Sequence, residues 1–318
     1  MRSFAFSIEK AWNVCIRHVM PSDPVHAEAD RRRWAVLFMI ASALCLSLMN
    51  LLAKEVSARI PLAEIVFARG IFGVLLNLLL LRQAGVSPWG RRRGLLVCRG
   101  LASTGALFAI YADLKALPLE EATVLQYLYP TFTALLAWVG LREQISKRLI
   151  VAIAAGWLGV VFVSQPAALF GGSSALPLVP VFIGLGGALL SAIAYVNVRA
   201  LAKSEHPLVV VFYFPLVSLP ISIPFVLMHP VLPTGMELLM LLGVGLFSQF
   251  AQLFLTVGFK HLPAARATSI SYVQVFFAAV WGWTLLGETI DQWELIGALM
   301  VMAATLLSLS SSARPMLR

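Results

Sequence analysis

The chain has little charge. Asp, Glu, Lys and Arg make up 12% of its 318 residues, against about 25% in a soluble domain. Hydrophobic residues make up 60% of it, which is more apolar surface than a chain of this length could bury in a water-soluble core. The composition therefore excludes a soluble globular protein. It predicts an integral membrane protein whose solvent is the lipid bilayer.

Cysteine is scarce, and the motifs of several functional classes are missing. Cys15, Cys45 and Cys98 stand alone, without a CxxC pair or the Cys/His spacing of a metal site, so we expect no disulfide, metal or other cofactor. No GxxxxGK[ST] loop is present, which excludes an ATP-driven pump on this chain alone. The five histidines are scattered and pair with no carboxylate at metal spacing. An integral-membrane enzyme acting on lipid-like substrates and a channel remain as alternatives, although a channel would need charged rings or a carbonyl filter.

Basic residues outnumber acidic ones, 24 to 15, for a net charge of +9. They form short clusters between apolar runs without interleaved aromatic residues, so we expect no nucleic-acid partner. The positive-inside rule explains them instead. If the N-terminus is cytoplasmic, every Lys and Arg falls on the inner side except Lys54, Arg59, Arg69 and Lys115. We therefore predict that both termini are cytoplasmic, and the short loops suit a bacterial inner membrane.

Ten segments are long and apolar enough to span a bilayer, which takes about 20 mostly apolar residues. The loops between them are short, and none could form a second domain. Before them, residues 1–33 form a cytoplasmic segment whose apolar spacing fits a helix lying on the membrane, and a mobile tail fits equally well. The predicted spans lie near 34–53, 62–82, 94–114, 119–141, 148–165, 177–199, 207–228, 236–258, 264–286 and 293–312.

One sequence pattern occurs twice. Residues 115–145 and 260–290 align without a gap at an offset of 145, and 12 of the 31 positions are identical. Because the repeating unit holds five spans, an odd number, the second copy enters the membrane upside down. We therefore predict an all-α integral membrane protein with ten transmembrane helices as two inverted five-helix repeats, 34–165 and 177–312. Inverted repeats suit alternating access, with the substrate where the halves meet.

Two stretches carry a resemblance to a known family. One is PLAEIVFAR at 61–69; the other is the doubled block, which starts with Leu-Pro and ends in Leu-Arg-Glu at 141–143 and Leu-Gly-Glu at 286–288. They resemble the EamA type of the drug/metabolite transporter superfamily over roughly residues 34 to 310. The resemblance implies a shared fold that carries many cargoes, among them amino acids, nucleotide-like metabolites, vitamins and organic anions.

Charged residues inside the predicted spans need a reason, since each costs roughly 2.5–3.5 kcal/mol on insertion scales. Arg69 lies about two turns into the second span, and we interpret it as a fixed positive charge for an acidic substrate group. Glu64, one to two turns away, is predicted to belong to the same substrate site; the alternative is that the two residues form a structural ion pair. Arg99, near the inner end of the third span, is expected to extend to the lipid headgroups. Glu143, at a span end, is expected to cap a helix or to be solvated.

Polar residues recur at matching depth in the fourth and ninth spans, which are equivalent in the two repeats. We predict that these faces are opposite walls of a central cavity, and that proline frees a backbone carbonyl there. The alternative is hydrogen bonding between helices. The predicted wall residues are Gln126, Tyr127 and Pro130 in one half and Ser271, Tyr272 and Gln274 in the other; Asn50, Tyr195 and Gln252 are further lining candidates.

The expected function is secondary transport of a small polar organic metabolite, by exchange or by proton coupling. Acidic residues that approach the membrane interior are Glu64 and Asp113, both near the outer face, so the residues leave the coupling open. The expected partners are this metabolite and the lipid bilayer. Ten spans can enclose a cavity alone, so we expect a monomer or a homodimer.

Overall fold

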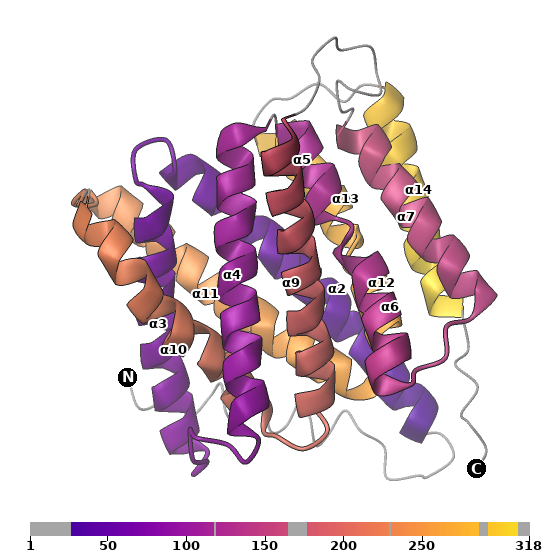
Figure 1. Cartoon of the computed structure of the whole chain (residues 1–318), viewed down its shortest axis with the longest axis horizontal. Coiled ribbons are helices and arrows are strands. Elements are labelled where there is room, and N and C mark those ends of the chain that lie inside the picture. The colour runs from indigo at the N-terminus through magenta and orange to yellow at the C-terminus, as the bar shows by residue number, and fades with distance from the viewer. Residues whose placement is uncertain (1–26, 118, 165–176, 229, 286–291, 311–318) are drawn as a thin grey trace.

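A computed structural model of the chain describes residues 27–117, 119–164, 177–228, 230–285 and 292–310. Within these ranges the chain forms α-helices and short connections, with no β-strand (Figure 1). The predicted all-α class is confirmed there. The predicted N-terminal segment lies outside the described residues as far as residue 26, and residues 27–33 belong to the first described helix.

The described helices form two sets in chain order, labelled as in Figure 1. The first set is α2 (Ala27–Val56), α3 (Leu62–Gln83), α4 (Arg93–Ala116), α5 (Leu119–Gln126), α6 (Tyr129–Leu141) and α7 (Lys147–Ser164). The second set is α9 (Leu178–Leu201), α10 (Pro207–Met228), α11 (Gly235–His261), α12 (Ala264–Ile270), α13 (Val273–Leu285) and α14 (Gln292–Ser310).

The helix bounds correspond at the offset found in the sequence. Adding 145 to the bounds of α3, 62 and 83, gives 207 and 228, the bounds of α10. The same addition carries the start of α5 at 119 to the start of α12 at 264, and the start of α7 at 147 to that of α14 at 292. The duplication seen in residues 115–145 therefore extends to the helices on either side.

The most extensive helix pairings join one half of the chain to the other. α2 packs on α11, α4 on α9, α3 on α10 and α7 on α14; the α7–α14 pair lies at one end of the row of helices (Figure 1). Replacing each helix by its copy turns the α2–α11 pair into the α9–α4 pair. It returns the α3–α10 and α7–α14 pairs to themselves. This exchange is what a twofold axis between the halves produces.

The equivalent helices α3 and α10 run in opposite directions. Glu64, at the start of α3, accepts a hydrogen bond from the backbone N–H of Val231, which follows the end of α10. Further along, a Cβ placed on Gly70 would contact Leu219, and one on Gly73 would contact Pro215. Residue numbers therefore rise along α3 as they fall along α10.

Seven described segments are long and apolar enough to cross a membrane. They correspond to the first four predicted spans and to the sixth, seventh and eighth. The remaining predicted spans, which fall on α7, α12–α13 and α14, stay a prediction. Large apolar side chains point outward from the bundle, for example Leu75, Val139 and Phe182 with 63, 68 and 69% of their surface exposed. Such a surface is stable when lipid covers it.

Each half contains one interrupted helical segment, α5–α6 in the first and α12–α13 in the second. α5 ends at Gln126 and α6 begins at Tyr129, with Pro130 in the first turn of α6, where its missing N–H costs little. α12 ends at Ile270 and α13 begins at Val273 without any proline at the break. The helix is interrupted at the equivalent place in both halves, although only one half has a proline there. The interruption is therefore a consequence of how the helices pack in this fold. Pro130 accommodates it in one half.

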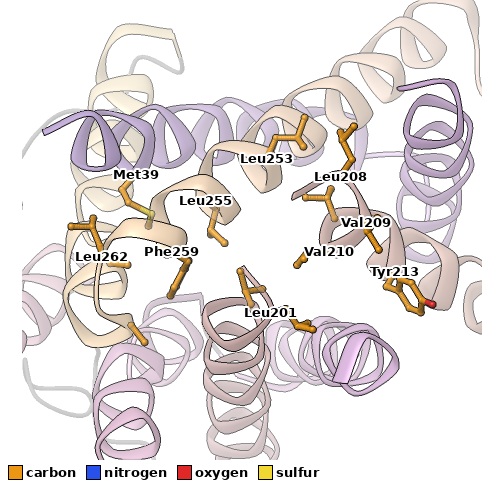
Figure 2. Packing of buried hydrophobic residues seen from close by; sticks show 14 of the residues in the cluster. Met39, Leu201, Leu208, Val209, Val210, Tyr213, Leu253, Leu255, Phe259 and Leu262 are labelled. Carbon is orange, nitrogen blue, oxygen red and sulfur yellow. The ribbon is translucent and has the colours of Figure 1, made fainter. Parts of the chain in front are cut away.

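The largest buried cluster lies where α2, α9, α10 and α11 meet (Figure 2). Leu201, Leu255 and Phe259 are almost fully buried in it. α10 contributes an unbroken buried run, Leu208–Pro215. A helical stretch that is apolar all round can be buried on every side, which explains the burial of this run.

The crossing of α7 and α14 depends on glycine. A Cβ on Gly297 would lie 2.6 Å from the carbonyl oxygen of Gly159 and 2.7 Å from the backbone nitrogen of Val163. Small residues let membrane helices approach this closely. We expect Gly297→Ala to destabilise the protein by about 1–3 kcal/mol, because backbone atoms cannot rotate away from the new methyl group. The measurement is the thermal unfolding midpoint of the purified protein.

Gly186 in α9 provides the control, since a Cβ there meets no atom within 4 Å. Gly186→Ala should leave the midpoint unchanged or raise it slightly, because alanine favours the helix. Equal midpoints for the two variants would contradict the close crossing.

Candidate functional site

A pocket lies among α3, α10 and α11, and the space between its lining atoms, counting the part that is open to solvent, is about 250 Å³. It lies at the pairing of the equivalent helices α3 and α10, at the opposite end of the row of helices from α7 and α14 (Figure 1). The residues that line it are Arg69, Gly70, Gly73, Val211, Phe214, Pro215, Ser218, Ser248, Gln249 and Gln252.

Six of these ten residues form three equivalent pairs. At the offset of 145, position 69 corresponds to 214, position 70 to 215 and position 73 to 218. Both members of each pair line the same space, so the axis that relates the halves passes through the pocket. The pairs are chemically unlike, since Arg69 corresponds to Phe214. The pocket therefore combines a symmetric frame with asymmetric side chains.

Glycines allow the helices around the pocket to approach each other. A Cβ on Gly73 of α3 would lie 2.9 Å from Cβ of Pro215. On α4, a Cβ on Gly100 would lie 2.8 Å from the carbonyl oxygen of Tyr213. These contacts seat α3 and α4 closely on α10 and bring one arginine from each helix to the same aromatic ring.

The ring is that of Phe214. Its centroid lies 4.9 Å from Cζ of Arg69 and 5.5 Å from Cζ of Arg99. Arg99 is 1% exposed, and its Nη2 donates a hydrogen bond of 2.7 Å to Oε1 of Gln252. The expectation that Arg99 extends to the headgroups was wrong. Its face of α4 is covered by other helices of the bundle, so the side chain turns inward.

Several polar atoms near the pocket lack a protein partner. Nε and Nη1 of Arg99 and Nε2 of Gln249 are buried without a hydrogen-bond acceptor in the part of the chain that the structure describes. Buried polar groups are normally paired, so these atoms indicate a place for a ligand. The described ranges contain no group of three or more His, Cys, Asp or Glu that could hold a metal ion.

The predicted tyrosine walls lie elsewhere and touch each other. Tyr127 and Tyr272 stack with ring centroids 6.1 Å apart, and the Tyr272 hydroxyl donates to the Tyr127 carbonyl oxygen at 3.3 Å. Tyr195 joins this cluster through Tyr129, with centroids 5.1 Å apart. Tyr127 and Tyr272 are equivalent positions, so the axis also passes between them. In this structure the halves are closed on each other at this point.

The other predicted site residues lie at the pocket, near the tyrosine cluster at the two helix interruptions, or away from both. Arg69 and Gln252 line the pocket, whereas Glu64 binds Val231 at the end of α3. Pro130 and Ser271 are buried at the two span breaks, and Gln126 and Gln274 are half-buried beside them; Asn50 is exposed on α2. The structure brings Arg69 and Gln252 together and leaves Asn50 outside both regions.

A second charged site joins the halves at one end of the bundle. Oε1 of Glu143 accepts a hydrogen bond from Nε of Arg199 at 2.9 Å, and its Oε2 accepts one from the backbone N–H of Ala264 at 2.7 Å. Nη1 of Arg199 donates to the carbonyl oxygens of Phe259 and Lys260 at 2.6 and 3.0 Å. We call this set the Glu143 junction. It caps the start of α12 from the other half of the chain, which confirms capping as the role of Glu143.

The opposite end has its own contact between the halves. Arg59, in the connection after α2, donates to the Glu237 carboxylate near the start of α11 and to the Leu232 carbonyl oxygen at 2.8 Å. The hydrogen bond that Arg59 donates to Glu237 raises the pKa of Arg59 above its usual value. The structure is therefore held across the halves at both ends, with the pocket between them.

Both halves of the chain match the EamA-like transporter family, over residues 33–165 and 178–310. The chain is 32% identical over 276 residues to the pseudopaline exporter CntI of Pseudomonas aeruginosa, covering 86% of this chain and 95% of that protein. It is 27% identical over 282 residues to mouse solute carrier family 35 member G1, covering 85% and 74% of the two chains. A solved crystal structure that shares 17% identity has the same fold, with a TM-score of 0.77 over 86% of this chain and 96% of that one. The chain therefore belongs to the EamA-like transporter family of the drug/metabolite transporter superfamily.

Proposed function

We propose that this chain is a secondary transporter that carries a small polar organic metabolite with an acidic group, such as an amino acid or organic anion, by alternating access. The observation that carries the proposal is the pocket lined by three equivalent pairs at the pairing of α3 with α10. Substrate sites of repeat-built transporters lie at the interface between the repeats. The relative named as an exporter supports outward movement of the substrate.

The proposed architecture is ten spans in two inverted repeats, 34–165 and 177–312. The opposite directions of α3 and α10 and the exchange of the α2–α11 and α4–α9 pairs support it. Under alternating access, each half adopts the conformation of the other, so contacts at the two ends open in turn. The Glu143 junction and the Arg59–Glu237 contact are the ties that would open.

We propose that the end holding the Glu143 junction faces the cytoplasm, with both termini on that side, in a bacterial inner membrane. The support is the charge of the connections there, which contain Arg91–Arg93, Arg142, Lys147, Arg148 and Lys203. Because the pocket is formed by a single chain, one chain is enough for transport, as a monomer or within a homodimer.

In the proposed cycle, Arg69 and Gln252 contact the substrate, and the Tyr127–Tyr272 contact separates when the halves open. Movement is driven by exchange or by proton coupling. Glu64 is buried in a span, and its carboxylate already accepts the Val231 N–H, which supports exchange. Uptake that is unchanged by a pH gradient and accelerated by internal substrate would identify exchange.

The experiment is a ligand screen followed by transport. Purified protein is heated with amino acids, organic acids, nucleosides, S-adenosylmethionine and cofactors, since a ligand that binds the folded state raises its stability, by about 2.7 kcal/mol at 100 times its dissociation constant. Ligands that stabilise the protein are then tested for counterflow in proteoliposomes. We expect a compound with an acidic group to pass both steps. Stabilisation by neutral or cationic compounds alone would contradict the proposal.

A further inference from the structure

We propose that the pocket binds a small organic dianion. Arg99 is a positioning residue, and its buried positive charge is the reason that the ligand needs a second acidic group. The inference rests on the proposed transport function and narrows its substrate class. Three observations carry it: two arginines at one ring, an uncompensated charge on Arg99, and the surplus of hydrogen-bond donors around the pocket.

Two positive charges lie at the same aromatic ring. Cζ of Arg69 and Cζ of Arg99 are 4.9 and 5.5 Å from the Phe214 centroid, so they are separated by no more than the sum of these distances. A guanidinium stays charged at any physiological pH. Two such charges repel each other strongly in a site of low dielectric, and a ligand with two negative charges removes that repulsion.

The charge of Arg99 is not balanced by the described part of the chain. The side chain is 1% exposed, and its hydrogen-bond acceptor there is the neutral amide of Gln252. Nε and Nη1 have no acceptor in the same ranges. A buried cation inside a membrane protein requires a counter-charge. Gln252, which accepts the hydrogen bond from Arg99, also lines the pocket, so a ligand in the pocket can supply this counter-charge.

The side chains that face the pocket offer mainly donors. Arg99 occupies the amide oxygen of Gln252, so the NH₂ group of Gln252 is left for the pocket. Gln249 is 3% exposed, lines the pocket, and has no acceptor for Nε2 among the described residues. Together with the guanidinium of Arg69, these donors match the oxygens of two carboxylates, sulfonates or phosphates.

The first test uses the wild-type chain. The purified full-length protein is titrated by calorimetry with matched pairs that differ in one acidic group: succinate with butyrate, glutarate with valerate, and L-glutamate with L-glutamine. We expect the member with two acidic groups to bind at least about tenfold more tightly. Equal affinities within every pair would overturn the inference.

The second test assigns the preference to Arg99. In Arg99→Gln we expect the tenfold ratio between the affinities of the two compounds in each pair to fall to about one. The compound with two acidic groups should bind more weakly, and the affinity of the compound with one should change little. Arg99→Lys, which keeps the charge, should restore much of the ratio. A ratio that survives in Arg99→Gln would overturn the role of Arg99. The wild-type ratio decides the dianion preference even if the variant does not fold.

The outcomes separate this inference from the proposed function. If neither member of any pair binds to the wild-type chain, the acidic-substrate pocket fails and the inference fails with it. If both members bind equally and are transported, the proposed function stands and the dianion inference alone is overturned.

Discussion

Arg69→Gln is expected to weaken binding of an acidic substrate on the order of 100-fold and to reduce its transport in proportion. Removing one partner of a desolvated charge pair costs about 2–5 kcal/mol, and each 1.4 kcal/mol is a factor of ten. Arg69 lines the pocket and lies over the Phe214 ring, so its charge acts where little water competes. Calorimetry on the purified variant and counterflow in proteoliposomes measure the two effects.

The control is Arg69→Lys, which keeps the charge but loses the planar group that stacks on Phe214 and binds a carboxylate with two parallel hydrogen bonds. It should bind more weakly than the wild type and more tightly than Arg69→Gln. Both variants should elute from a sizing column in detergent as the wild type does. Aggregation of Arg69→Gln with loss of folded protein would identify Arg69 as a structural tie between helices.

Glu143→Gln is expected to lower the free energy of unfolding by about 3 kcal/mol. The pair it breaks is mostly buried, with 12% of the Arg199 side chain and 15% of the Glu143 side chain exposed. Removing one partner of a buried ion pair leaves the other charge buried without compensation, which costs about 3–5 kcal/mol; the residual exposure places our expectation at the lower end. Glutamine also binds the Ala264 N–H less strongly than a carboxylate does. Chemical unfolding in a mild detergent measures the loss.

An exposed ion pair in the same protein provides the comparison. Asp30 and Arg33 lie 3.8 Å apart on α2, with 33 and 82% of their side chains exposed. Exposed pairs contribute about 0.2–1 kcal/mol, so Asp30→Asn should change stability little. A double-mutant cycle between Glu143→Gln and Arg199→Gln should give a large coupling energy. If Glu143→Gln and Asp30→Asn destabilise the protein equally, the Glu143 junction does not hold the halves together.

The repeat could be predicted from the sequence because duplicated segments keep their spacing. The offset of 145 in one 31-residue block extends to helix bounds far from that block, such as those of α3 and α10. The same offset could have identified Phe214, since it corresponds to Arg69. That signal was missed because a phenylalanine in an apolar span is ordinary, and its meaning depends on what packs against it.

The neighbours of each helix could not be predicted in the same way. Helical spacing shows which residues share a face but leaves open which helix covers that face. Arg99 is close to the predicted inner end of its span, where an arginine often extends to the headgroups; the packing of α4 on α9 and α10 buries it instead. The sequence gives no reason to single out Gln249, because its place beside the pocket follows from the pairing of α11 with α3.

The two arginines at Phe214 also have an electrical consequence. A charge that crosses the full membrane potential changes in energy by about 2.3 kcal/mol per 100 mV. A dianion in the pocket cancels the charges of Arg69 and Arg99. The loaded protein therefore moves no net charge through the membrane potential when its pocket switches from one side of the membrane to the other. The empty protein carries both charges through part of the potential. Where the empty protein does change its facing, a potential that is negative inside therefore favours the pocket facing the cytoplasm.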